Sequence, residues 1–377
     1  MDREVKSLLL LCSGRSGEMA DSTSENDHGY GDIGRVLDLA VYHGIFPVIY
    51  ETLAEKGMEM GQEYVSLYRK IRREGMFLSC ELSRIITSLR REGIEALPFK
   101  GPALSMLAYG DTYSRHSSDL DILIGKKDIR KVISIVSKLG YESSYPVDFT
   151  EDFVCMDIMG DIVFLNREKG YNIEFHWRLF EKSLYMRMDT ESVFSFADEV
   201  DLCTKGIKSF SSEYLIVYLA MHGAKHGWER LKWFCDMDRV VRRGGIDWEE
   251  VERIAIESGG YRSLYSILYA CRELLETPLP KMVEEIVDRE EIADIGRYSI
   301  RMVIRNLDGG AGGIGEKIEL QRYRLSVVDS SPHPLTYTVR SLMTLSYLDC
   351  SVLSLPSYLR FLYYPLRVVR LLRKNLF

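Results

Sequence analysis

The chain has 377 residues, of which 46% are hydrophobic and 28% charged, a balance typical of ordinary globular proteins with a sizeable core. This length predicts two or three domains. The net charge of −7 and the sequence pI near 5.7 argue against a generic nucleic-acid-binding protein, which usually carries a basic footprint. A local basic groove is still compatible with this balance.

The seven cysteines are dispersed, and no two of them form a C-x-x-C pair. We interpret them as mostly buried thiols, which predicts a cytoplasmic location. The four-leucine run near the start is shorter than the roughly 7–15 apolar residues of a signal-peptide core. No run reaches the roughly 18 apolar residues of a membrane span, so no transmembrane segment is expected.

The first 95 residues show the 3.6-residue spacing of apolar side chains that is typical of helices. We predict helices over 1–12, 32–56 and 62–92, with a polar, glycine-rich loop between the first two. Pro47 is expected to split the second of these segments into two helices. Gly93 follows the third helix as a plausible C-cap.

The spacing changes near residue 96, where short apolar runs alternate with helical segments. Strands are predicted over 96–100, 119–124, 153–158, 162–166 and 172–177, and helices over 102–109 and 127–139. Gly160 and Asp161 are expected to turn a hairpin between two of the strands. The segment 96–205 therefore reads as an α+β unit.

Helical spacing returns beyond residue 205. Helices are predicted over 212–227, 229–243, 247–257, 261–275 and 281–305. A glycine-rich break follows, and the tail ends in a basic helix after Pro365. The predicted organisation is an N-terminal helical region (1–95), the α+β core (96–205), a helical domain packing on the core (206–305), and a flexible break with a helical tail (306–377).

Two carboxylates alternate with apolar residues in the predicted strand 119–124. Asp119 and Asp121 lie at i and i+2, so their side chains point to the same face and could share Mg²⁺. Two solvated aspartates at a strand edge are the simpler alternative. Asp236 and Asp238 have the same spacing, but in a helical stretch, where such residues do not share a face.

The loop before these carboxylates has the composition of a phosphate-binding turn. Lys100 and Gly101 end a strand and begin a helix, whose free N–H groups attract anions. Arg115 and Ser117 stand just before the aspartates and could reach phosphates, although Arg115 could equally neutralise Asp119. Lys100 could also be a solvated surface lysine.

A metal-dependent site needs a further carboxylate, and Glu174 in the predicted strand 172–177 is the candidate. It would be a metal ligand or a general base toward the acceptor. A surface-facing glutamate is the alternative. His176 faces the same side of that strand and could orient Glu174.

His222 and His226 are four residues apart, hence on one face of a predicted helix. A zinc protease motif requires glutamate after the first histidine, whereas Gly223 stands here, so zinc is not expected. The helix could place both histidines over the cleft, near the nucleotide, or use them in hydrogen bonds between domains.

The terminal helix places Arg367, Arg370 and Lys374 on one face. This face could make a weak contact with an anionic membrane or a polyanion. A solvated face on a packed helix is the commoner outcome.

The run KGPAL…YG…SRHSSDLDILI, between Lys100 and Ile124, resembles the polymerase-β-type nucleotidyltransferase superfamily, especially its uncharacterised or putative nucleotidyltransferases. It is also similar to the abortive-infection toxin nucleotidyltransferases. Two flanking stretches, Asp38 to Gly44 and His222 to Asp236, strengthen the resemblance. It implies a small mixed sheet with a helical domain packed on it. It also implies Mg²⁺- or Mn²⁺-dependent transfer of a nucleoside monophosphate from an NTP.

The resemblance maps the metal ligands onto Asp119, Asp121 and Glu174. One departure stands out, because the superfamily has Gly-Gly or Gly-Ser where this chain has Gly101-Pro102. Proline suits the first turn of a helix but removes one phosphate-facing N–H. The acceptor is unidentified and could be a small molecule, a protein or an RNA. Two alternatives remain open: a non-catalytic nucleotide-binding or scaffold protein, and a toxin-like enzyme acting on tRNA.

Overall fold

A computed structural model describes residues 3–13, 30–145, 158–181, 185–307, 314–329, 334–346, 348–349, 355 and 357–376. The N-terminal helices are α1 (Arg3–Ser13), α2 (Ile33–His43), α3 (Phe46–Glu55) and α4 (Gln62–Arg91). The expected break between α2 and α3 is confirmed, but its cause differs. Gly44 in the left-handed conformation ends α2, whereas Pro47 lies in the first turn of α3.

The centre of the chain forms a five-stranded mixed sheet in the order β1-β2-β5-β4-β3. Its strands are β1 (Ala96–Pro98), β2 (Asp119–Ile124), β3 (Glu142–Ser143), β4 (Asp161–Asn166) and β5 (Tyr171–His176). Only the β2–β5 pair is parallel; the other three pairs are antiparallel. The helices α5 (Gly101–Tyr109), η1 (Lys126–Asp128) and α6 (Ile129–Lys138) connect the strands. A small mixed sheet flanked by helices confirms the predicted α+β class.

The hairpin predicted at Gly160 and Asp161 is contradicted at Ile158, which is helical where the last residue of a strand was expected. The rest of the predicted strand 153–158 lies outside the described residues. The hairpin of the sheet is formed instead by β4 and β5, whose paired ends meet at Asn166 and Tyr171.

The chain continues through α9 (Thr190–Ser195) and a two-stranded hairpin of β6 (Asp198–Val200) and β7 (Ile207–Ser209). The helical region then comprises α10 (Ser212–Lys225), α11 (Lys232–Arg243), α12 (Trp248–Ser258), α13 (Tyr261–Leu275), α14 (Lys281–Val287) and α15 (Glu290–Leu307). The predicted helix 281–305 is thus two helices. The described tail comprises α16 (Ile314–Ser326), α17 (Pro334–Met343), η2 (Ser357–Leu362) and α19 (Tyr363–Leu376).

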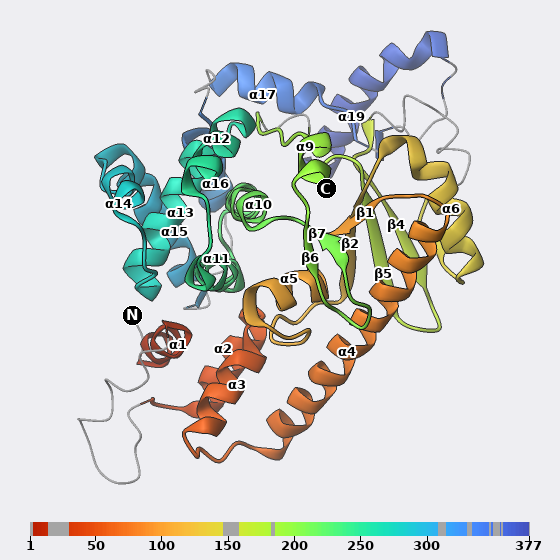
Figure 1. Ribbon diagram of the computed structural model, residues 1–377. Coiled ribbons are helices and arrows are strands. Elements are labelled where there is room, and N and C mark those ends of the chain that lie inside the picture. The colour runs from red at the N-terminus through yellow and green to blue at the C-terminus, as the bar shows by residue number, and fades with distance from the viewer. Residues whose placement is uncertain are drawn as a thin grey trace.

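A small apolar cluster joins Tyr363 to Ile158, Leu345 and Leu355, and two larger apolar cores hold most of the remaining elements together. One lies between the sheet and the helices α4 and α6, which run along one side of it (Figure 1). The other joins α1, α2 and α3 to α10–α15 and reaches the sheet through Leu97, Phe99 and Leu123. The N-terminal helices therefore pack on the helical region that follows the sheet. The division at residues 95, 205 and 305 stays a prediction.

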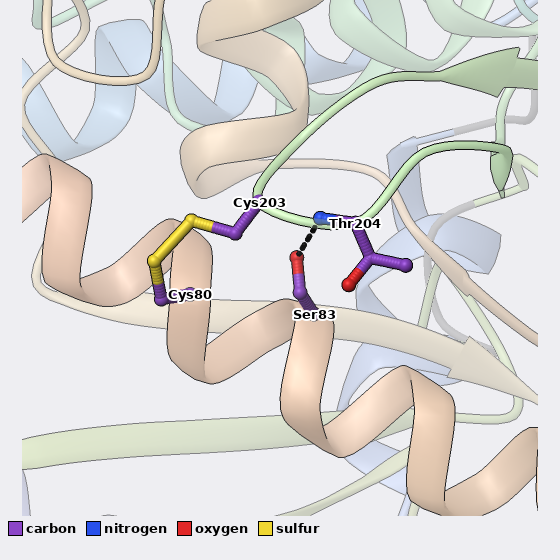
Figure 2. The surroundings of a disulfide bond; sticks show 4 residues. All are labelled: Cys80, Ser83, Cys203 and Thr204. Carbon is purple, nitrogen blue, oxygen red and sulfur yellow. Dashed lines mark hydrogen bonds between the residues drawn. A yellow bond between two sulfur atoms is a disulfide. The ribbon is translucent and has the colours of Figure 1, made fainter.

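The expectation of dispersed free thiols is wrong for one pair of cysteines. Cys80 on α4 and Cys203 in the β6–β7 loop form a disulfide, with a Cα–Cα distance of 5.0 Å and a sequence separation of 123 residues (Figure 2). Beside it, the Ser83 hydroxyl accepts a hydrogen bond from the Thr204 amide. Because 123 residues separate the two cysteines, no local sequence pattern could predict their pairing. The prediction of a cytoplasmic location rested on free thiols, so the disulfide weakens it.

Within the described residues, no helix combines the length and apolar character that crossing a membrane requires.

Removing the disulfide should destabilise the protein. The bridge closes a long loop and so restricts the unfolded chain, which predicts a loss of roughly 2–5 kcal/mol in the free energy of unfolding for Cys80→Ser/Cys203→Ser. Chemical denaturation measures it. A reductant should lower the stability of the wild type to that of the double variant and leave the variant unchanged. Equal stability of the wild type with and without reductant would contradict the bridge.

Candidate active site at the β2–β5 pair

Two carboxylates face each other across the parallel β2–β5 pair. Asp121 is in register with Glu174, and Asp119 with Asn172. Because side chains alternate along a strand, the residues between them, such as Leu120 and Ile173, point into the core under α4 and α6. The same alternation that buries the apolar face brings the two acids together on the opposite face.

His176 completes a compact group with these acids. Its Nε2 lies 3.2 Å from Asp121 Oδ1 and 3.6 Å from Glu174 Oε2. One ligand atom from each of the three residues lies within 4.8 Å of the others, a spacing suited to a single cation. His176 thus faces Glu174 as the strand pattern indicated, and it adds a nitrogen to the carboxylate set.

Asp119 stands beside this group, outside the three residues that could hold one ion. Its Oδ1 accepts a hydrogen bond from the Ser117 hydroxyl at 3.0 Å. Its charge still reaches the cluster. Burial, and then the charges of Asp121 and Asp119, raise the pKa of Glu174 above the usual glutamate value. A role for Asp119 as a metal ligand stays a prediction.

Lys100 neutralises the buried Asp121. Its Nζ lies 3.0 Å from Asp121 Oδ1, and the Asp121 side chain is 2% exposed. Burial alone would raise the pKa of Asp121, but the charge of Lys100 and the hydrogen bond from His176 lower it well below the usual range. Lys100 is therefore the counter-ion of the acid cluster, and not a solvated surface lysine.

A cavity of about 490 Å³ opens beside the cluster, within the size range of small-molecule sites. Lys100, Glu174 and His176 line one part of it, and His222 and His226 another. Burial lowers the pKa of both helix histidines, for His226 to about 4. Both rings are therefore neutral at pH 7 and offer stacking surfaces and hydrogen-bonding nitrogens, without a positive charge.

The glycine after His222 has a packing role. A Cβ at Gly223 would lie 2.1 Å from the ring of Trp228, so only glycine admits that ring against α10. Trp228 is fully buried and donates its indole N–H to Tyr323. This packing fixes the turn between α10 and α11.

Three residues of the predicted phosphate loop do not line this cavity. Gly101, at φ +56°, packs so closely on β2 that a Cβ would lie 3.0 Å from the Asp119 carbonyl oxygen. Ser117 bonds to Asp119. Arg115 is buried and donates to Asp236 Oδ2 at 2.8 Å, so it neutralises an acid of α11 and not Asp119. Asp238 accepts a hydrogen bond from Arg242 instead. Asp236 and Asp238 thus have different partners, as expected because residues two apart on a helix do not share a face.

Sequence reasoning missed Lys232, at the start of α11. Within the described part of the chain, no hydrogen bond or ion pair holds its ammonium group. Burial and the charge of Arg115 lower its pKa to about 8, although Asp236 and Asp119 act in the opposite direction. Its side chain runs over Gly44, where a Cβ would lie 2.9 Å from Lys232 Cδ.

The contact between Lys232 and Gly44 joins the two flanking stretches singled out in the sequence. The Leu231 amide donates to His43 Nδ1 at 3.1 Å, which fixes the same junction. Spacing along the chain could not have revealed this contact, because 188 residues separate its partners.

The terminal basic helix differs from the expectation of a free cationic face. Arg367 and Arg370 both bind Asp349, at 2.6 Å and 2.7 Å, and Asp349 is buried. Arg367 also lines the cavity. The position of the Lys374 side chain lies outside the described residues.

A family model described as "Uncharacterised nucleotidyltransferase" matches residues 31–276, a range that includes the whole acid cluster, both cavity histidines and Lys232. A comparison with curated proteins finds no match.

Replacing Lys100 tests its pairing with Asp121. Lys100→Met leaves a buried carboxylate without its counter-ion, which should lower the free energy of unfolding by roughly 3–5 kcal/mol in EDTA. Mn²⁺ should stabilise the variant more than the wild type, because the acid cluster lacks its own cation. Lys208→Met removes an exposed pair with Glu95 and should cost roughly 0–1 kcal/mol. If both variants lost the same free energy of unfolding, Lys100 would not be the counter-ion of Asp121.

The neutral histidines should make the protein acid-sensitive. Because the pKa of folded His226 is about 4 and the unfolded value is about 6.5, the unfolded state binds a proton first as the pH falls. Stability is therefore present above pH ~6.5 and lost toward pH ~4. His226→Gln should reduce this loss by roughly 2 kcal/mol in denaturation curves across that window. If the free energy of unfolding changed with pH equally in the wild type and in His226→Gln, the lowered pKa of His226 would be contradicted.

Proposed function

Because the chain belongs to the family of uncharacterised nucleotidyltransferases, we propose that it transfers a nucleoside monophosphate from an NTP to a hydroxyl group of an acceptor, with Mg²⁺ or Mn²⁺. The observation that carries the proposal is the in-register placement of Asp121 and Glu174 with His176 at the wall of a cavity.

The donor set fits a divalent cation. Asp121, Glu174 and His176 would hold it, with Asp119 as a further carboxylate on the same face. Carboxylate oxygens suit Mg²⁺, and a carboxylate set with one imidazole also suits Mn²⁺. Burial raises the pKa of Glu174, and the negative charges of Asp121 and Asp119 raise it further. When bound, the metal would polarise the transferred phosphate and neutralise its developing charge.

Glu174 is the candidate general base for the acceptor hydroxyl. It is only partly buried and lines the cavity, where an acceptor can approach it. A carboxylate whose pKa is raised accepts a proton more readily near neutral pH. Lys100 keeps Asp121 ionised. The two acids therefore have different roles: Asp121 remains an anion, whereas Glu174 can accept a proton.

The donor is held by charge at its phosphates and by ring contacts at its nucleoside. We assign the charge to Lys232, which is not among the residues that line the cavity but lies close enough to Asp119 for that charge to raise its pKa. Lys100, Lys225 and Arg115 are engaged with Asp121, Glu181 and Asp236. Within the described residues no carboxylate forms an ion pair with the Lys232 ammonium group, which suits it to a phosphate group supplied by the substrate. His222 and His226 offer neutral rings to the base or ribose.

A non-catalytic nucleotide-binding protein is the second candidate. The buried pair of Lys100 and Asp121 favours it, because it satisfies a metal-binding carboxylate without metal. Incubation with labelled NTPs, Mn²⁺ and a cell extract distinguishes the transferase from the non-catalytic nucleotide-binding protein. Transfer of label to an acceptor supports the enzyme, whereas nucleotide binding without transfer supports the second candidate.

Asp121→Asn should abolish Mg²⁺- or Mn²⁺-dependent NTP binding while the fold is retained, because the buried ligand oxygen becomes a neutral amide. Calorimetric titration with NTP and metal measures it. Asp161→Asn is the matched control: Asp161 lines the same cavity but is outside the three-residue cluster, so binding should change little. Unchanged binding in Asp121→Asn would show that the site is misplaced.

Lys232→Gln should weaken NTP binding roughly tenfold, the usual effect of losing one hydrogen bond to a charged group. Lys232→Arg should retain most of the affinity, and Lys70→Gln, an exposed lysine on α4, should bind like the wild type. A nucleoside without phosphates should bind all of these equally. If the wild type binds NTP and Lys232→Gln binds it equally well, the phosphate role is wrong.

A further inference from the structure

The C-terminal segment 334–376 is unusually rich in exposed apolar side chains for its length. Ten of the 18 large hydrophobic side chains that are exposed among the described residues belong to it. Its most exposed members define what we call the C-terminal surface. They are Val339 (49%), Met343 (48%), Leu348 (54%), Tyr358 (75%), Phe361 (62%) and Val369 (50%).

Five of these six residues lie on α17, η2 and α19, and α19 contacts η2 as well as α17. α17 and α19 contact each other, and both lie at the end of the molecule away from α2 and α3 (Figure 1). Large exposed apolar patches on proteins in water mark surfaces that contact another phase or partner. The segment also lies outside the range matched by the family model, so the family assignment does not account for it.

The charge of the segment is opposite to that of the rest of the chain. Residues 334–377 carry a net charge of +5, whereas the remaining residues carry −12. The one acidic residue of the segment, Asp349, is withdrawn from the surface: it is buried and bound by Arg367 and Arg370. Arg340 and Arg373 are exposed. The exterior of the segment therefore combines apolar side chains with cations.

We propose that the C-terminal surface docks on an anionic lipid bilayer. Aromatic and aliphatic side chains enter the boundary between headgroups and acyl chains, and arginines attract anionic headgroups. A polyanion such as RNA would leave Leu348 and Val369 without apolar partners. A second copy of the chain docked through the same surface would bring together two segments that each carry a net charge of +5, and these repel each other.

The helices of the segment are suited to lie on the bilayer. The 14 residues of α19 span about 21 Å, less than the ~30 Å of a bilayer core. Docking would also place the active-site cavity near the lipid surface, because Thr344, Leu345, Ser346 and Arg367 of the same segment line that cavity.

Vesicle co-sedimentation of the full chain tests the proposal. The protein should sediment with phosphatidylcholine vesicles containing about 30% phosphatidylserine, and much less with pure phosphatidylcholine. Phe361→Ser/Val369→Ser should reduce the bound fraction about tenfold, because two apolar side chains leave the interface. Arg373→Glu should lower binding to the anionic vesicles specifically. Phe77→Ser is the matched control, since Phe77 is a similarly exposed phenylalanine on α4, and it should bind like the wild type.

Three outcomes would overturn the proposal. One is the absence of wild-type binding to either vesicle. Another is an equal loss of vesicle binding in Phe77→Ser and in Phe361→Ser/Val369→Ser. The third is a concentration-dependent dimer, seen by sedimentation velocity, that the double variant abolishes while vesicle binding is unaffected. Unchanged melting temperatures of the variants exclude unfolding as the cause, and none of these readouts depends on transferase activity.

Discussion

The parallel pairing of β2 with β5 is the constraint on which the site depends. Its register sets Asp121 opposite Glu174, and the alternation of side chains sends Leu120 and Ile173 to the other face. A slip of one residue would bury the acids under α4 and α6 and expose the core. The apolar core therefore fixes the geometry of the acid cluster, because it allows only one register.

The chain then neutralises each buried acid near the site with a specific cation. Lys100 serves Asp121, Arg115 serves Asp236, and two arginines serve Asp349. An unpaired buried charge is costly, so these pairs are what allow so many ionised groups around one cavity. Within the described residues Lys232 has no such partner, although the charges of Asp119 and Arg115 act on it, and this is why we propose it as the group that binds a phosphate.

The cavity is assembled from three parts of the chain that are distant in sequence. The sheet supplies the carboxylates, α10 supplies the histidines, and the segment around residues 344–346 with Arg367 supplies a further wall. Gly223 and Trp228 lock the end of α10, and His43 holds the start of α11. The C-terminal segment thus belongs to the site and, through its exposed apolar side chains, also to the outer surface.

Local pattern determined much of this protein. The period-2 alternation in β2 and β5 identified the strands and the face of Asp119, Asp121 and Glu174, because side-chain direction follows from spacing alone. Pairing in space was decided by the tertiary structure. Sequence could not show that Arg115 pairs with Asp236, that Cys80 bonds to Cys203, or that Lys232 lies over Gly44, because these contacts join segments brought together only when the two cores form.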